Sequence, residues 1–119
     1  MHNTRMAPSL STVDYILDQL VSLSDVHVRK MFGEYALYCD GRVVGLVCDD
    51  TLYIKITEQG KLFVGAHYVE GHAYKGARAS MRIDEDLIEN REWLAELVRI
   101  TAENVPPMVP KKKKSERKN

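Results

Sequence analysis

The sequence has no long apolar run and no recognisable export signal. None of its apolar stretches approaches the roughly 18 residues that a membrane-spanning helix needs. The first residues, MHNTRMAPS, lack the apolar core of a signal peptide. We therefore expect a cytoplasmic protein without membrane contact, and the 119 residues suffice for one compact domain.

Cysteine is also scarce, because Cys39 and Cys48 are the only two in the chain. A single pair of this kind forms neither a disulfide framework nor a zinc-ligand pattern. Reduced thiols are typical of cytoplasmic proteins, so the cysteine content agrees with the expected compartment.

Motifs for catalysis or cofactor binding are missing. No serine lies in a nucleophile elbow, and no glycine-rich loop has phosphate-binding spacing after a strand. The sequence therefore predicts no enzyme activity, no catalytic residue and no cofactor. A cluster of metal-ligating residue types comprises His67, Glu70 and His72 in the stretch HYVEGH, but Gly71 breaks the helical spacing of metalloprotease histidines. These three residues are either metal candidates or solvated loop side chains.

Charge is balanced overall but unevenly distributed. Residues 111–119, KKKKSERKN, hold six basic residues and one acid, which leaves 11 basic and 16 acidic residues in the rest of the chain. Such a segment after Pro106 buries little apolar surface, so we expect a proline-containing linker and a disordered tail over residues 106–119. The tail is either solubilising or a sequence-blind nucleic-acid contact, because it offers charge without base readout. The residues of that contact would be Lys111, Lys112, Lys113, Lys114, Arg117 and Lys118.

Apolar residues recur at helical spacing near the N-terminus. Ser11 and Asp14 form a variant capping box, which predicts a helix from about Ser11 to Leu23. One apolar stripe follows from the spacing of Val13, Ile16, Leu17, Leu20 and Val21.

Two further helices are predicted later in the chain. Thr57 can cap a short helix through about Gly65. Asn90 opens a last helix, which ends before Pro106. The apolar stripe of that helix comprises Trp93, Leu94, Leu97, Val98 and Thr101.

Strands are predicted between these helices. A first strand ends at Gly33, and Asp40-Gly41 is the strongest hairpin signal, because a type I′ turn needs positive φ at both central residues. The register that follows pairs Cys39 with Arg42, Leu37 with Val44, and Tyr35 with Leu46. Further strands are predicted at 51–56 and 79–83, whereas 67–77 looks irregular. This order of elements predicts an α+β fold, in which helices cover one face of an antiparallel sheet in two layers.

The predicted register assigns side chains to two faces of the sheet. The face under the helices would hold Ala36, Tyr38, Val43, Gly45, Val47, Leu52, Ile54 and Ile56. The other face would be a candidate interaction face with Tyr35, Leu37, Val44, Leu46 and Tyr53. The same register places Cys39 and Cys48 on one face, roughly 20 Å apart, which is too far for a disulfide or a shared metal.

Several short motifs together resemble a known family, the N-terminal domain of the TfoX/Sxy competence regulators. The matching stretches are Met31-Phe32-Gly33, Tyr35-Ala36-Leu37-Tyr38, Asp40-Gly41-Arg42, the run from Asp50 to Lys55, and the segment from Met81 to Leu94. The resemblance covers roughly residues 12–104. It implies a two-layer, secretion-chaperone-like fold and a regulatory role, and it carries over no catalytic or ligand residue.

The resemblance also suggests how the chain is divided. Residues 1–10 would be an N-terminal extension, 11–105 the TfoX N-terminal-like domain, and 106–119 the linker and tail. Full-length members of the family carry a second, helical domain where this sequence has its basic tail.

Three hypotheses for the function remain open. The leading one is a non-enzymatic module that binds a protein partner or a second copy through the mixed sheet face. The second is sequence-blind nucleic-acid binding by the tail. The third is a metal-binding protein or enzyme that uses His67, Glu70 and His72.

Overall fold

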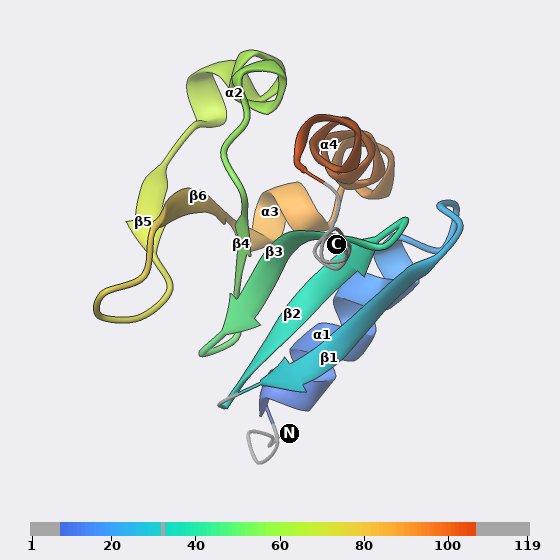
Figure 1. Cartoon of the computed structure of the whole chain (residues 1–119). Coiled ribbons are helices and arrows are strands. Elements are labelled where there is room, and N and C mark those ends of the chain that lie inside the picture. The colour runs from blue at the N-terminus through green and yellow to red at the C-terminus, as the bar shows by residue number, and fades with distance from the viewer. Residues whose placement is uncertain (1–7, 32, 107–119) are drawn as a thin grey trace, which may run out of the picture.

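The computed structural model describes residues 8–31 and 33–106 of the chain. The described helices and strands are, in chain order, α1 (Pro8–Gln19), β1 (Val26–Met31), β2 (Glu34–Cys39), β3 (Arg42–Cys48), β4 (Thr51–Ile54), α2 (Glu58–Val64), the 3-10 turn η1 (Gly65–His67), β5 (Glu70–His72), β6 (Ala79–Ile83), α3 (Glu85–Ile88) and α4 (Arg91–Asn104). The strands form one six-stranded antiparallel sheet in the order β1-β2-β3-β4-β6-β5 (Figure 1). The predicted α+β fold is thus confirmed.

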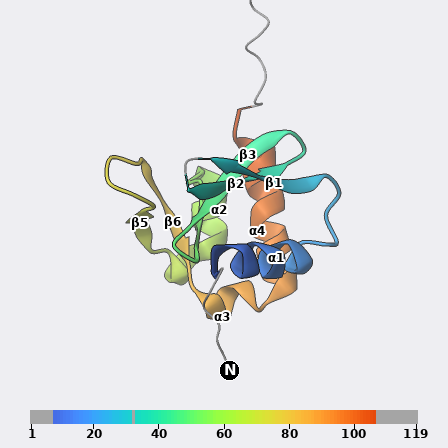
Figure 2. The same ribbon diagram turned by 90° about the horizontal axis from the view of Figure 1, so that it is seen from below.

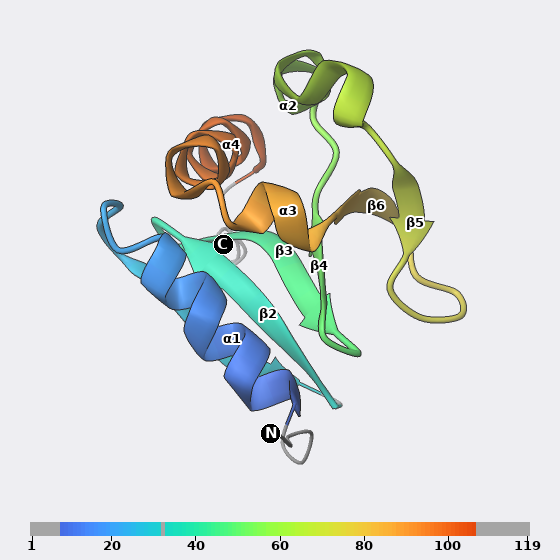
Figure 3. The same cartoon turned by 180° about the vertical axis from the view of Figure 1, so that it is seen from behind.

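The helices gather on one face of the sheet. Seen from below, α1, α3 and α4 all lie on the same side of β1, β2 and β3 (Figure 2). The view from behind shows α1 running along β2, with α4 and α3 beside it (Figure 3). None of the helices in the described ranges has the length and apolarity to cross a bilayer.

Helix α1 begins and ends earlier than predicted. It starts at Pro8, whose fixed φ suits the first helical position, so Ser11 lies inside the first turns and not at the start. Val13, Ile16 and Leu20 are buried, as the spacing predicts. Val21 is 67% exposed, because the helix ends at Gln19 and the turn that follows places Leu20 and Leu23 against the core instead.

The helices α2 and α4 begin where their capping residues predict. The Thr57 hydroxyl accepts a hydrogen bond from the amide of Gly60 at 2.9 Å, and the Asn90 side chain accepts one from the amide of Trp93 at 3.2 Å. Each of these bonds satisfies an amide that the helix itself leaves free. The buried stripe of α4 comprises Leu94, Leu97, Val98 and Thr101, with Trp93 half-buried at its edge.

The hairpin between β2 and β3 confirms the predicted turn but not the predicted register. Asp40 and Gly41 have φ values of 54° and 76°, and Cys39 pairs with Arg42. A bulge then shifts the register: Tyr38 pairs with Val43, but Leu37 pairs with Gly45 and Tyr35 with Val47. The predicted pairs Leu37 with Val44 and Tyr35 with Leu46 are wrong, because Val44 is an extra residue in β3.

The bulge reverses the predicted faces of β2 and of the first part of β3, up to Val44. Leu37 and Val44 are each 0% exposed, and Tyr35 packs against the same core under the helices. Ala36, Tyr38 and Val43 lie instead on the outer side of the sheet. Beyond the bulge the prediction agrees with the structure, since Val47, Leu52 and Ile54 are buried in the core and Ile56 packs against it.

Two elements were not predicted. Strand β5 lies in the segment expected to be irregular, and it pairs with β6 through Glu70, Gly71 and His72. Helix α3 is a single turn of four residues. Both are too short to show a hydrophobic period, so only their packing against longer elements identifies them.

Candidate functional site: the open face of the sheet

The outer side of the sheet is called the open face here, because no helix in the described ranges covers it (Figures 2 and 3). A row of cross-strand pairs runs across it: Arg29 with Ala36, Ala36 with Leu46, Leu46 with Tyr53, and Tyr53 with Arg82. Of the five residues predicted for an interaction face, only Leu46 and Tyr53 lie on this side. Both are half-buried, so apolar surface remains accessible to a partner.

Aromatic stacking covers the part of the open face near β1. The rings of His27 and Tyr38 lie 4.9 Å apart and within 4° of parallel. Tyr38 is consequently only 8% exposed, and its neighbour Ala36 only 4%. This end of the face carries the stacked aromatic pair, whereas the other end is hollowed.

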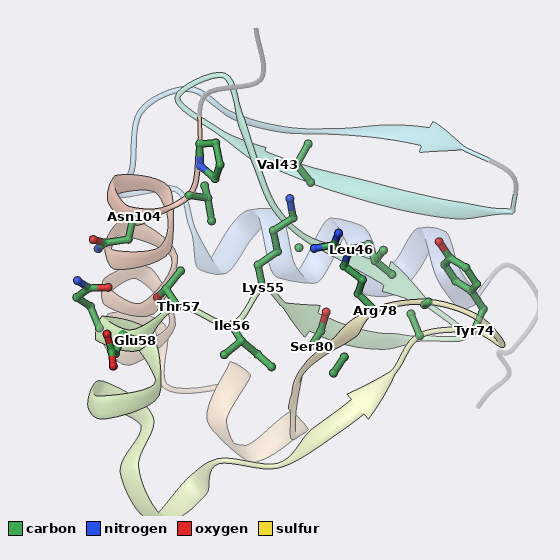
Figure 4. Close-up of a pocket in the computed structure, with 17 residues that line it drawn as sticks. Val43, Leu46, Lys55, Ile56, Thr57, Glu58, Tyr74, Arg78, Ser80 and Asn104 are labelled. Atoms are coloured by element: carbon green, nitrogen blue, oxygen red, sulfur yellow. The ribbon is translucent and has the colours of Figure 1, made fainter. Parts of the chain in front are cut away.

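The hollow is a pocket of about 630 Å³, called here the Lys55 pocket (Figure 4). Its walls come from β3, from the segment between β4 and α2, from the start of α2, from the loop between β5 and β6 with the start of β6, and from the end of α4. The side chains that matter for its chemistry are Val43, Leu46, Lys55, Tyr74, Arg78 and Ser80. Segments far apart in the sequence therefore meet around one cavity.

Lys55 lies in the middle of this pocket (Figure 4). Its backbone amide donates to the carbonyl of Val44 at 2.8 Å, so the bulge residue anchors it to β3. Partial desolvation, and secondarily the positive charge of Arg78, lower the pKa of the Lys55 ammonium. Neither cation forms an ion pair with a carboxylate within residues 8–31 and 33–106.

The loop between β5 and β6 is closed by hydrogen bonds and places Tyr74 and Arg78 at the pocket. The amide of Ala77 donates to the carbonyl of Tyr74 at 3.0 Å, and Gly76 between them has a φ of 88°. His72 Nδ1 lies 2.8 Å from the carbonyl oxygen of Ala77. Because a carbonyl only accepts, Nδ1 carries the proton and donates.

Hydrogen bonding also fixes the end of α4 at the pocket. Arg42 donates from Nη1 to the carbonyl of Ala102, near the C-terminus of the helix, where a cation is favourable. Asn104, Val105 and Pro106 lie just after Ala102 in the chain, beyond Glu103, and line the pocket. The β2–β3 hairpin thereby holds the pocket wall that α4 provides.

The three metal candidates serve different contacts in the structure. The His67 ring meets Trp93 edge-on with centroids 6.4 Å apart, and Glu70 accepts a hydrogen bond from the Tyr68 hydroxyl at 2.9 Å. His72 holds the loop described above. Among the residues that the structure places, no group of three His, Cys, Asp or Glu side chains could hold a metal ion.

The two cysteines are free, but they do not share a face. Cys39 is buried in the core, whereas Cys48 is half-buried on the open face. Burial, and then the nearby carboxylates of Asp40 and Asp25, raise the pKa of the Cys39 thiol to about 11. The prediction of a common face is wrong because the bulge lies between the turn and Cys48.

The six predicted nucleic-acid contact residues of the tail, Lys111 to Lys114, Arg117 and Lys118, lie outside the described residues. Their contact with nucleic acid therefore stays a prediction.

The fold agrees with the comparison of the sequence with known families. The sequence profile of the TfoX N-terminal domain matches residues 18–105, and the chain belongs to this family. The resemblance predicted from the short motifs is thus confirmed.

Two relatives show how far the similarity extends. A Spirochaeta aurantia protein, named as an uncharacterized 12.7 kDa protein in the trpE 5′ region, is 36% identical over 110 residues, which are 92% of this chain and 94% of that protein. Protein Sxy of Escherichia coli (strain K12) is 31% identical over 85 residues, which are 67% of this chain and 41% of Sxy. The chain is therefore similar to a protein of its own length and to less than half of the longer Sxy.

Proposed function

We propose that this chain is a non-enzymatic, competence-regulator-like module that binds a protein partner or a second copy of itself through its open face. The observation that carries the proposal is the one-sided cover of the sheet: α1, α3 and α4 pack on the same face of it. The other face keeps half-exposed apolar side chains at Val43, Leu46 and Tyr53. The similarity to Sxy supports a regulatory role.

The arrangement of the open face fits a protein contact. Interfaces combine an apolar centre with a polar rim, and aromatic residues and arginine are enriched in them. Leu46 and Tyr53 form a cross-strand pair at the centre, and Arg29 and Arg82 lie at the two ends of the same row. The exposed ring of His27, stacked on Tyr38, adds an aromatic surface beside it.

Replacement of Leu46 by Asp tests the proposal. A charge at the apolar centre should weaken association by about tenfold or more, because it would be desolvated without a partner. Sedimentation analysis would measure self-association, and affinity capture followed by mass spectrometry would measure partner recovery.

Leu62→Asp is the matched control. Leu62 is 79% exposed on α2 and does not line the open face, so the same change there should leave association intact. Thermal unfolding of both variants checks that the fold persists. An unchanged oligomeric state together with unchanged partner recovery for Leu46→Asp would refute the proposed interface.

A further inference from the structure

Lys55 and Arg78 place two positive charges in one pocket without a carboxylate between them. Figure 4 shows Lys55 in the middle of the cavity with Arg78 beside it, and the two are close enough for Arg78 to lower the Lys55 pKa. Neither forms an ion pair within the described ranges. Two neighbouring cations repel each other, and a bound anion would remove that repulsion.

The one acid that lines the pocket lies at its other end. Glu58 is the first residue of α2, and Figure 4 draws it beside Thr57 and Asn104, away from Arg78. Its position in the first turn of the helix already favours its negative charge. Glu58 therefore leaves the cationic end of the pocket uncompensated.

The rest of the lining suits a ligand with an apolar body. Val43, Leu46 and Ile56 supply aliphatic surface, and Tyr74 supplies an aromatic ring from the loop. Ser80 adds a hydroxyl near the cations. The volume of about 630 Å³ falls within the roughly 300 to 1,000 Å³ that is usual for small-molecule sites.

We propose that the Lys55 pocket binds a small organic anion, namely a phosphate or carboxylate group carried on an apolar or aromatic body. Lys55 and Arg78 receive the anionic group through charge-assisted hydrogen bonds, and the aliphatic wall with Tyr74 receives the body. The pocket shares Val43 and Leu46 with the proposed protein interface, but its cations Lys55 and Arg78 are its own, so anion binding is tested on the chain without a partner.

Hydrogen bonds fix the two backbone segments that carry Lys55 and Arg78. Lys55 is fixed through its amide to Val44, and the loop that bears Arg78 is clasped by His72 on the carbonyl of Ala77. These bonds fix the backbone that carries the two cations, whereas their exposed side chains become ordered when they contact the anion. The accessible side chains of Lys55 and Arg78 give the anion a path from solvent.

The test is a titration of the isotope-labelled chain, followed by two-dimensional nuclear magnetic resonance of the backbone amides. Phenyl phosphate and benzoate are the anionic probes, and benzyl alcohol is the uncharged probe with the same ring. We expect saturable shifts centred on Leu46, Lys55 and Arg78, with a Kd on the order of millimolar or tighter for at least one anion. The tighter of the two anions identifies the preferred head group.

Variants separate charge recognition from general apolar binding. Lys55→Gln and Arg78→Gln should each weaken binding of the preferred anion by about tenfold, whereas Lys55→Arg should retain most of it. Lys61→Gln is the matched control. Lys61 lies on α2, its ammonium is over the ring of Tyr68, and it does not line the pocket. The amide spectrum of each variant reports directly whether the fold is intact.

Three results would overturn the proposal. The first is the absence of saturable shifts with either anion. The second is benzyl alcohol binding as tightly as the anions, which would mean an apolar pocket without charge selectivity. The third is unchanged affinity in a folded Lys55→Gln or Arg78→Gln variant.

Discussion

Val44 decides which side of the sheet several of its neighbours face. As the extra residue of a bulge, it turns into the core and is 0% exposed. Gly45 follows it, and a Cβ there would lie 2.2 Å from the backbone oxygen of Tyr53. Strand β4 can thus approach β3 closely only because residue 45 is glycine. The bulge is the reason that Leu46 faces outward and Cys39 inward.

Because Cys39 faces the core and Cys48 the open face, the two thiols should differ in their rate of alkylation. The thiolate is the reactive form, and the pKa of both thiols is raised, so modification at neutral pH should be slow and should accelerate as pH rises. Half-buried Cys48 should react with iodoacetamide well before buried Cys39, whose pKa is about 11. Peptide mass spectrometry across a pH series measures both rates, and labelling in denaturant should make them equal. Faster labelling of Cys39 in the folded chain would contradict this assignment.

At the scale of elements, Gln19 joins α1 to the junction of α3 and α4. Its side-chain amide donates to the carbonyls of Ile88 and Glu89 at 2.8 and 3.2 Å, and its oxygen accepts from Arg91 at 3.2 Å. Gln19 is only 6% exposed, so these bonds are shielded from water. Nothing in the local sequence marks this glutamine, because its partners are some 70 residues away in the chain.

Replacement of Gln19 by Met should lower the free energy of unfolding by about 1 to 3 kcal/mol, because the side chain keeps its size but leaves carbonyls unpaired. Urea-induced unfolding followed by circular dichroism measures the change.

Asp18→Ala is the control for that change, since Asp18 also binds Arg91, at 3.3 Å, but on the surface. An exposed ion pair contributes under about 1 kcal/mol, so this variant should remain near the parent. An equal loss of unfolding free energy in the two variants would show that Gln19 does not stabilise the fold through its buried hydrogen bonds.

At the scale of the whole molecule, charge is segregated. The chain without residues 111–119 carries 11 basic and 16 acidic residues, and four of its cations, Arg29, Lys55, Arg78 and Arg82, lie on the open face. Helices α3 and α4 carry acids such as Glu85, Asp86 and Glu92. An acidic partner would therefore be attracted to the open face and repelled from the helical layer.

Truncation after Pro110 should separate the tail from the folded part in nucleic-acid binding. We expect the whole chain to bind duplex DNA with an affinity that falls steeply with salt, because each phosphate contact contributes about −0.9 to the logarithmic slope. The truncated chain should lose this binding. Fluorescence anisotropy with two unrelated duplexes over a salt series measures it. Sequence preference retained by the truncated chain would contradict a sequence-blind tail and point to the open face.

Local signals in the sequence determined the turns, the caps and the class of fold. The Asp40-Gly41 turn, the caps at Thr57 and Asn90 and the family motifs depend on residues close together in the chain, whose backbone preferences act without the rest of the molecule. The alternation beyond the bulge likewise placed Leu52 and Ile54 in the core.

Only the tertiary structure decided the faces of the hairpin and the site. The bulge adds one residue to β3. It thereby exchanges the inward-facing and outward-facing side chains of the hairpin, although the composition of the strands is the same in either register. The Lys55 pocket requires β5, which has too few residues for a period and forms only by pairing with β6. Lys55 follows the end of a strand and Arg78 lies in a loop distant from it in sequence. The two positive charges therefore come together only once the sheet has folded.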